Sequence, residues 1–124
     1  IRDQPRSRGL GDVYKRQEEI HTTFNENGTK AKEGKIVDGK EEGVWTTFDD
    51  QGQKTEETTY IEGKEDGLYT SWYESGQKSG EVTYRDGRLD GPTTVWHQNG
   101  QKAEEGIFKD GEKVSAKYWN SKGE

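Results

Sequence analysis

Two histidines and a regularly spaced set of glutamates are the residues of this sequence best suited to acid–base or metal chemistry. The histidines, His21 and His97, have neither a cysteine nor a spaced pair of carboxylates beside them, so we expect them to be structural or neutral. The glutamates recur every 24 residues, at Glu33, Glu57, Glu81 and Glu105. In successive hairpins such carboxylates would lie two strands apart, roughly 10 Å, which is too far to share one ion. We therefore predict no catalytic residue, no metal site and no cofactor, and we expect these glutamates to pair with lysines across the sheet.

The composition is unusual for a folded domain. Only 24% of the 124 residues are hydrophobic and 35% are charged, and Leu, Ile, Val and Phe together number 17. Such a low apolar content is typical of disordered chains. The 17 glycines and the 13 aromatic residues, placed at regular intervals, instead favour a thin sheet covered by aromatic side chains. There is no cysteine and no apolar run long enough to cross a membrane as a helix.

Residues 1–17 differ from the rest of the chain. They carry a net charge of +3, whereas residues 18–124 carry −9. The stretch "LGDVYKRQ" resembles translated sequencing adapter, and we predict that 1–17 is a non-native, disordered tail and that 18–124 is a repeat domain. A basic arm for nucleic acid or an anionic membrane is the alternative. We expect both native ends to be missing, which leaves a bacterial cytoplasmic, lipoprotein or secreted location open.

A period of 24 residues organises the domain. Rows of equal length align without gaps at residues 15–38, 39–62, 63–86 and 87–110, and a partial row covers 111–124. One glycine position in each row, predicted to form a turn, is occupied by Gly28, Gly52, Gly76 and Gly100. The large positions, predicted to form the structural core, are occupied by Phe24, Phe48, Trp72, Trp96, Tyr60, Tyr84 and Phe108.

Short stretches rich in Thr, Val, Tyr and Trp lie between the glycines and predict strands. Twelve residues per strand and turn leave no room for a crossover helix, so the strands should be antiparallel neighbours. We predict an all-β, elongated, single-layer meander built of 24-residue hairpins. A three-residue loop with a positive φ at its glycine would place Phe48 and Tyr60 on one face and Lys54 opposite Phe48. A two-residue turn would separate Phe48 from Tyr60.

The recurring pattern G-K-x-D-G, an aromatic strand, G-Q-K and then E-x-x-Y resembles MORN repeats, specifically the bacterial variant in proteins described as YwqK-like antitoxins. The resemblance implies a single-layer sheet that serves as an interaction platform, and it covers about residues 18–123. Pro92 departs from the pattern, and we expect imperfect strand pairing there.

Two functions remain open from the sequence. In the first, the face that carries Trp45, Tyr69 and Tyr73 binds a protein partner; the family resemblance implies a toxin domain that an antitoxin neutralises. In the second, the repeats are a structural spacer or scaffold without a dedicated ligand, or a membrane-associated platform. The charge of −9 disfavours nucleic acid and anionic lipid. No helix follows the glycine pairs, so they are not phosphate-binding loops. Oligomeric state is open.

Overall fold

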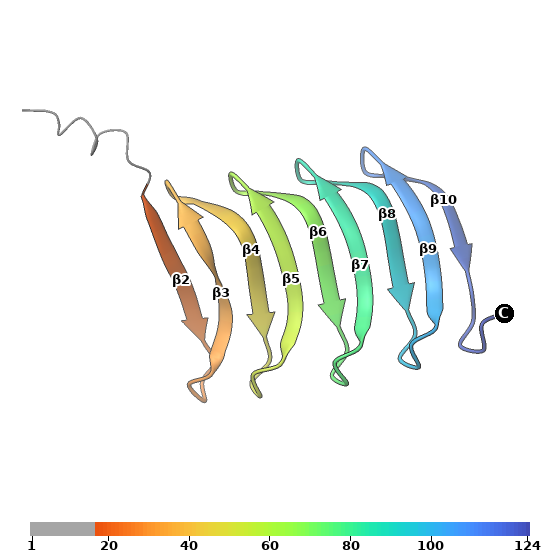
Figure 1. The fold of residues 1–124 in the computed structure, drawn as a ribbon, viewed down its shortest axis with the longest axis horizontal. Helices are drawn as coiled ribbons and strands as arrows, with labels where there is room; N and C mark the ends of the chain where they lie inside the picture. Colours follow the sequence, from red (N-terminus) through yellow and green to blue (C-terminus); the bar gives the residue numbers. More distant parts are fainter. Residues whose placement is uncertain (1–16) are drawn as a thin grey trace, which may run out of the picture.

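A computed structural model describes residues 17–124, and residues 1–16, which hold nearly all of the predicted tail, lie outside the described part. The described residues form one nine-stranded antiparallel sheet in which each strand pairs with the next strand along the chain. Figure 1 shows the strands side by side in a single layer. The strands are β2 (Glu18–Phe24), β3 (Lys30–Val37), β4 (Lys40–Phe48), β5 (Lys54–Ile61), β6 (Lys64–Trp72), β7 (Lys78–Arg85), β8 (Arg88–Trp96), β9 (Lys102–Lys109) and β10 (Glu112–Tyr118). The predicted all-β meander is confirmed.

Two kinds of turn alternate along the sheet. Between β4 and β5, Asp49 and Gln53 enclose a three-residue loop, residues 50–52. The Asp49 N–H donates to the Gln53 carbonyl at 2.8 Å and the Gly52 N–H donates to the Asp49 carbonyl at 3.1 Å. Gly52 has φ +86°, as this loop type requires. The other turns have two residues, both with positive φ, and are occupied by Asp38 and Gly39, Glu62 and Gly63, Asp86 and Gly87, and Asp110 and Gly111.

A bulge beside each three-residue loop changes which residues share a face. Phe48 pairs with Lys54 as predicted, but the next pair is Thr47 with Glu56, so Thr55 is an extra residue in β5. The same extra residue occurs at Ala31, Ser79 and Ala103. An extra residue reverses the alternation of side chains beyond it. Tyr60 therefore lies on the face of Trp45, and the prediction that Phe48 and Tyr60 share a face is wrong.

The two faces have different side chains. We call "ring face" the one that carries His21, Trp45, Tyr60, Tyr69, Tyr84 and Phe108. The other, the "open face", carries Ile20, Val44, Leu68 and Pro92 together with Phe24, Phe48, Trp72 and Trp96.

The predicted core needs correction. None of its seven aromatic residues is buried: Phe24 is 63% exposed, and Phe48, Trp72, Trp96, Tyr60, Tyr84 and Phe108 are half-buried. They are also divided between the two faces, because of the bulges. The buried apolar residues of the described chain are Val37 and Trp45, each 5% exposed. A single layer has no second layer against which a whole column of rings could be buried.

Pro92 does not disturb the sheet. It pairs with Ile107 of β9, and on its other side it lies in a register shift between Val82 and Tyr84 of β7. The same shift occurs at the corresponding places of β4 and β6, where Gly43 and Gly67 have positive φ. Because the ladder is already interrupted there in every repeat, the missing N–H of proline is tolerated. The imperfect pairing expected at Pro92 is present on the side of β7, but it occurs in every repeat and is therefore not caused by the proline.

Candidate functional site

The open face carries the predicted glutamates, each beside a lysine. The pairs are Lys30 with Glu33 at 3.1 Å, Lys54 with Glu57 at 3.1 Å, Lys78 with Glu81 at 2.8 Å, and Lys102 with Glu105 at 2.6 Å. Residues three apart in a regular strand point to opposite faces, and the bulge residue between them brings them together. The lysine partner is thus on the same strand and not across the sheet. The lysine amines lower the pKa of Glu33 and Glu105.

Apolar side chains lie exposed between these ion pairs. Ile20 is 67% exposed, Val44 55%, Leu68 51% and Ile107 43%. Val44, Leu68 and Pro92 occupy the same position of successive repeats, and Ile107 pairs with Pro92. These residues form a row across the strands, which we call the apolar row; Thr59 and Thr83 occupy it on β5 and β7, where they pair with Val44 and Leu68. The open face therefore offers a hydrophobic surface with charged pairs along one side.

Shallow hollows repeat beside this row. One is lined by Gln53, Lys54, Trp72 and Gly76, and the other by Gln77, Lys78, Trp96 and Gly100. In the first, the Lys54 ammonium lies 5.6 Å from the centroid of the Trp72 ring. The lysine of one repeat thus covers the tryptophan of the next, which leaves these rings half-buried in a structure without a second layer.

The ring face holds a hollow of about 230 Å³, lined by Lys32, Trp45, Thr47, Glu56, Thr58, Tyr60, Glu65, Tyr69 and Tyr84. The rings meet edge to face: the centroids of Trp45 and Tyr60 are 6.3 Å apart, and those of Tyr69 and Tyr84 are 6.4 Å apart. Trp45 is fixed in place because its Nε1–H donates to the Lys35 carbonyl at 3.1 Å and its ring covers Gly34.

Carboxylates surround the phenol groups of this hollow. The Tyr69 hydroxyl donates to the Glu56 carboxylate, and Tyr60 pairs with Glu65 across the strands. Burial, with the Glu56 hydrogen bond, raises the pKa of Tyr69 above its ordinary value. Burial also raises the pKa of Tyr60, with Glu65 and Glu41 adding to the effect. Both phenols therefore stay protonated, and the negative charge of the hollow comes from its glutamates.

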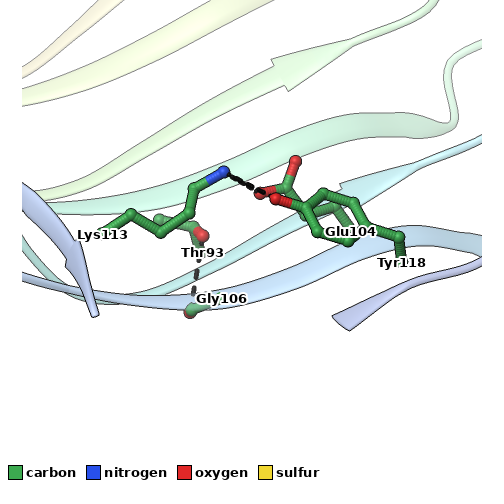
Figure 2. A network of polar contacts seen from close by, with 5 residues as sticks. All are labelled: Thr93, Glu104, Gly106, Lys113 and Tyr118. Carbon is green, nitrogen blue, oxygen red and sulfur yellow. Dashed lines mark hydrogen bonds and ion pairs between the residues drawn. The ribbon is translucent and has the colours of Figure 1, made fainter. Parts of the chain in front are cut away.

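At the C-terminal end of the ring face, Lys113 lies beside aromatic rings and a carboxylate. The Lys113 ammonium lies 5.7 Å from the Phe108 ring centroid and 5.4 Å from that of Tyr118. It donates to the Glu104 carboxylate at 2.7 Å and to the Tyr118 hydroxyl at 3.1 Å, and Figure 2 shows the side chains turned toward each other. These two hydrogen bonds raise the pKa of Lys113. Figure 2 also shows the Thr93 hydroxyl, which is buried and donates to the Gly106 carbonyl.

The three residues predicted to form a partner-binding face do not lie together. Trp45 and Tyr69 both line the hollow of the ring face, but Trp45 is buried. Tyr73 lies at the start of a three-residue loop, where its hydroxyl donates to the Trp96 carbonyl of the next repeat. The hollow that Trp45 and Tyr69 line also has lining residues that were not predicted from the sequence to belong to a site: Tyr60, Tyr84, Glu56 and Glu65.

The histidines support the sheet. The His21 ring lies 5.9 Å from the Trp45 ring, and the His97 Nε2 atom lies 2.8 Å from the Trp119 carbonyl oxygen. Within residues 17–124, no three His, Cys, Asp or Glu side chains gather closely enough to hold a metal ion. That same part of the chain contains no helix that could cross a membrane.

Comparison with protein families identifies the repeat. The model of the MORN repeat variant matches residues 41–62, 65–86 and 89–110, together 66 of the 124 residues. The chain belongs to this family. The three matches are consecutive and coincide with the hairpins β4–β5, β6–β7 and β8–β9. MORN repeats are commonly protein- or membrane-interaction modules, and proteins that contain them are generally non-catalytic. No curated protein and no solved structure matched the chain.

Proposed function

We propose that this MORN repeat chain is a non-catalytic platform that binds a protein through its open face. The observation that carries the proposal is the apolar row of Val44, Leu68 and Ile107, which are between 43% and 55% exposed in a sheet with a single layer. Large apolar side chains exposed to water favour an interaction site, and here the intervening strands β5 and β7 add the smaller side chains of Thr59 and Thr83 to the row. The Lys–Glu pairs beside the row supply polar contacts at its rim.

The proposed partner is a toxin domain, so that the chain acts as the antitoxin or immunity component of a bacterial toxin–antitoxin pair. The support for this finer proposal is the resemblance of the G-K-x-D-G and G-Q-K motifs to YwqK-like antitoxins. The test co-produces the chain with a nuclease or deaminase toxin domain encoded beside its gene and counts surviving colonies. Survival that depends on the chain is the expected result, and equal killing with and without the chain would contradict the antitoxin role.

The surface itself is tested with a triple variant, Val44→Thr/Leu68→Thr/Ile107→Thr. Threonine keeps strand propensity while removing the apolar row. We expect the folded variant to retain at least tenfold less partner than the wild type in a capture experiment. The matched control is Val95→Thr/Val114→Thr, which changes exposed valines outside the row and should retain the partner. Equal capture by all three proteins would contradict the assignment of the open face.

A spacer or scaffold without a dedicated ligand is the second candidate function, favoured by the regular repetition of one hairpin along the sheet. It predicts that no protein is captured in a manner that depends on Val44, Leu68 and Ile107. A membrane-associated platform instead predicts sedimentation with phosphatidylglycerol vesicles. The net charge of −9 in residues 18–124 opposes binding to an anionic membrane.

A further inference from the structure

A lysine of the chain itself, Lys113, lies against aromatic rings at one end of the ring face. The Lys113 ammonium lies near two aromatic rings, Phe108 and Tyr118, and its charge is paired with the Glu104 carboxylate at 2.7 Å. Figure 2 shows this arrangement of Lys113, Glu104 and Tyr118. Rings that contact an ammonium group through their faces, together with a carboxylate, stabilise a cation by cation–π attraction and direct charge pairing.

The same positions recur 48 residues earlier, with two differences. Ser71 pairs with Glu56 where Tyr118 pairs with Glu104, so that ring is absent, and the residue in the place of Lys113 has the opposite charge. Tyr60 stands where Phe108 stands, and Glu56 stands where Glu104 stands. Tyr60 pairs with Glu65 in the way that Phe108 pairs with Lys113. Position 65, which corresponds to that of Lys113, therefore holds the carboxylate of Glu65. The earlier site keeps the aromatic ring and the glutamate and carries the opposite charge at the position of the ammonium group.

That earlier site is the hollow of about 230 Å³ on the ring face. Four rings line it, those of Trp45, Tyr60, Tyr69 and Tyr84, together with the carboxylates of Glu56 and Glu65. Lys32 also lines it, with its ammonium 5.7 Å from the Trp45 ring centroid. The ion pairs of the described residues do not include Lys32, so two carboxylates face one cation.

We propose that this hollow binds a lysine side chain of a protein partner, with the partner's ammonium group between the aromatic rings and the carboxylates of Glu56 and Glu65. Charge complementarity selects the occupant, because a neutral side chain would leave the excess negative charge of two carboxylates over the one cation, Lys32, without compensation. The arrangement around Lys113 is the intramolecular form of the same contact. Glu56 keeps its hydrogen bond from the Tyr69 hydroxyl and uses its remaining lone pairs for the ammonium group.

The inference concerns the ring face, whereas the proposed function rests on the open face. The inference rests on the proposed function in one respect, namely that the group bound in the hollow belongs to a protein. Binding of a lysine probe to the hollow can therefore fail while the open face still captures its partner, and the reverse can also occur. Two different sets of variants report on the two surfaces.

The test titrates the whole chain with N-acetyl-lysine methylamide and follows the Trp45 indole N–H and the tyrosine ring signals by NMR. N-acetyl-norleucine methylamide, which has a similar stem without the charge, serves as the neutral probe. We expect the lysine probe to shift the signals of Trp45, Tyr60 and Tyr69, and the norleucine probe to bind at least tenfold more weakly. Equal binding of both probes, or no shift with the lysine probe, would overturn the proposal.

Substitutions at Glu65, which lines the hollow, test whether the lysine probe binds there. Glu65→Lys places an ammonium group of the chain itself at the position equivalent to Lys113 and should weaken the binding of the lysine probe at least tenfold. Glu65→Gln should weaken its binding by about threefold to tenfold. The matched control is Glu57→Gln, which removes the same charge from β5 on the opposite face and should change the affinity by less than twofold. Equal effects of Glu65→Gln and Glu57→Gln would show that only net charge matters and would overturn the site.

Two further measurements decide between sources of the cation. Lys32→Gln removes the cation that lines the hollow and should strengthen the lysine probe by about twofold to threefold; weaker binding in this variant would contradict the proposed occupant. Tetramethylammonium represents a free quaternary ammonium ion. If it binds more than tenfold more tightly than the lysine probe, the hollow is a small-molecule site and the assignment to a protein lysine is wrong.

Discussion

Gly34 and Trp45 form the closest large-to-small contact of the sheet, and their coupling can be measured. A Cβ atom at position 34 would lie 2.0 Å from Cδ2, 2.3 Å from Cε2 and 2.4 Å from Cγ of Trp45. Carbon atoms in contact are separated by about 3.5 Å or more, so the indole would have to move by more than 1 Å. That movement breaks the 3.1 Å hydrogen bond from its Nε1–H to the Lys35 carbonyl.

The cost of Gly34→Ala can be bounded from the ring that it displaces. Removing a buried tryptophan side chain costs about 3 to 5 kcal/mol, and Trp45 is 5% exposed. Gly34→Ala in the wild type should therefore lower the free energy of unfolding by about 3 kcal/mol. In a Trp45→Ala background the clash is gone, and alanine is favoured over glycine in a strand by about 0.5 to 1 kcal/mol. There the same substitution should be neutral or slightly stabilising.

Urea unfolding followed by far-UV circular dichroism measures the four proteins of this cycle. Because a repeat array can open locally, hydrogen exchange of the amides in β3 and β4 supplies a second measure. Gly80→Ala is the control: its Cβ would lie 3.1 Å from the Ser71 hydroxyl and 3.9 Å from the Thr94 carbonyl oxygen, and the effect should stay within about 0.5 kcal/mol. The reasoning is refuted if Gly34→Ala destabilises the Trp45→Ala protein as much as it destabilises the wild type.

Three further predictions concern turns and pH. Gly76 has φ +91° and nothing within 4 Å of an added Cβ. Gly76→Ala should therefore lower the free energy of unfolding by about 1 to 2 kcal/mol from backbone strain alone, and Gly76→Asn should lower it less. Equal losses for the two variants in urea unfolding would contradict this. Glu62, with φ +50°, lies in a two-residue turn where the other repeats have aspartate. Glu62→Asn should therefore raise the free energy of unfolding by about 0.5 kcal/mol. A lower midpoint of urea unfolding in this variant would count against the prediction. The pKa values of Tyr60 and Tyr69 are raised from 10.0, so their contribution to the free energy of unfolding is complete below pH 10 and is lost as the pH rises above it. Tyr69→Phe should reduce this loss of stability at alkaline pH. An unchanged dependence of the free energy of unfolding on pH would argue against it.

The 24-residue period was sufficient to predict the nine-stranded meander, because each glycine position marks a turn and each turn length leaves room for one strand. It was not sufficient to predict the faces. The assignment of Phe48 and Tyr60 to one face followed the loop length alone, and the extra residue at Thr55 reversed it. A bulge adds one residue without changing the period, so the repeat pattern does not reveal it.

One signal of the bulge was nevertheless present in the sequence. Every repeat carries K-x-x-E after its three-residue loop, as in Lys54 to Glu57. Lysine and glutamate three residues apart cannot meet on one face of a regular strand, and the expected partner was a lysine across the sheet. The pair forms within β5 because Thr55 is an extra residue between Lys54 and Glu57. Had this pairing within the motif been assumed, it would have placed Trp45 and Tyr60 on one face.

This change of face also determines what each surface can do. With Tyr60 and Tyr84 on the side of Trp45 and Tyr69, the rings and carboxylates gather on the ring face, where a charged group can be held between them. The open face keeps Val44 and Leu68 exposed beside neutral Lys–Glu pairs, which suits an apolar contact. One inserted residue per repeat thus separates a surface for cations from a surface for apolar side chains. A partner that engages both must reach around the sheet or present two segments.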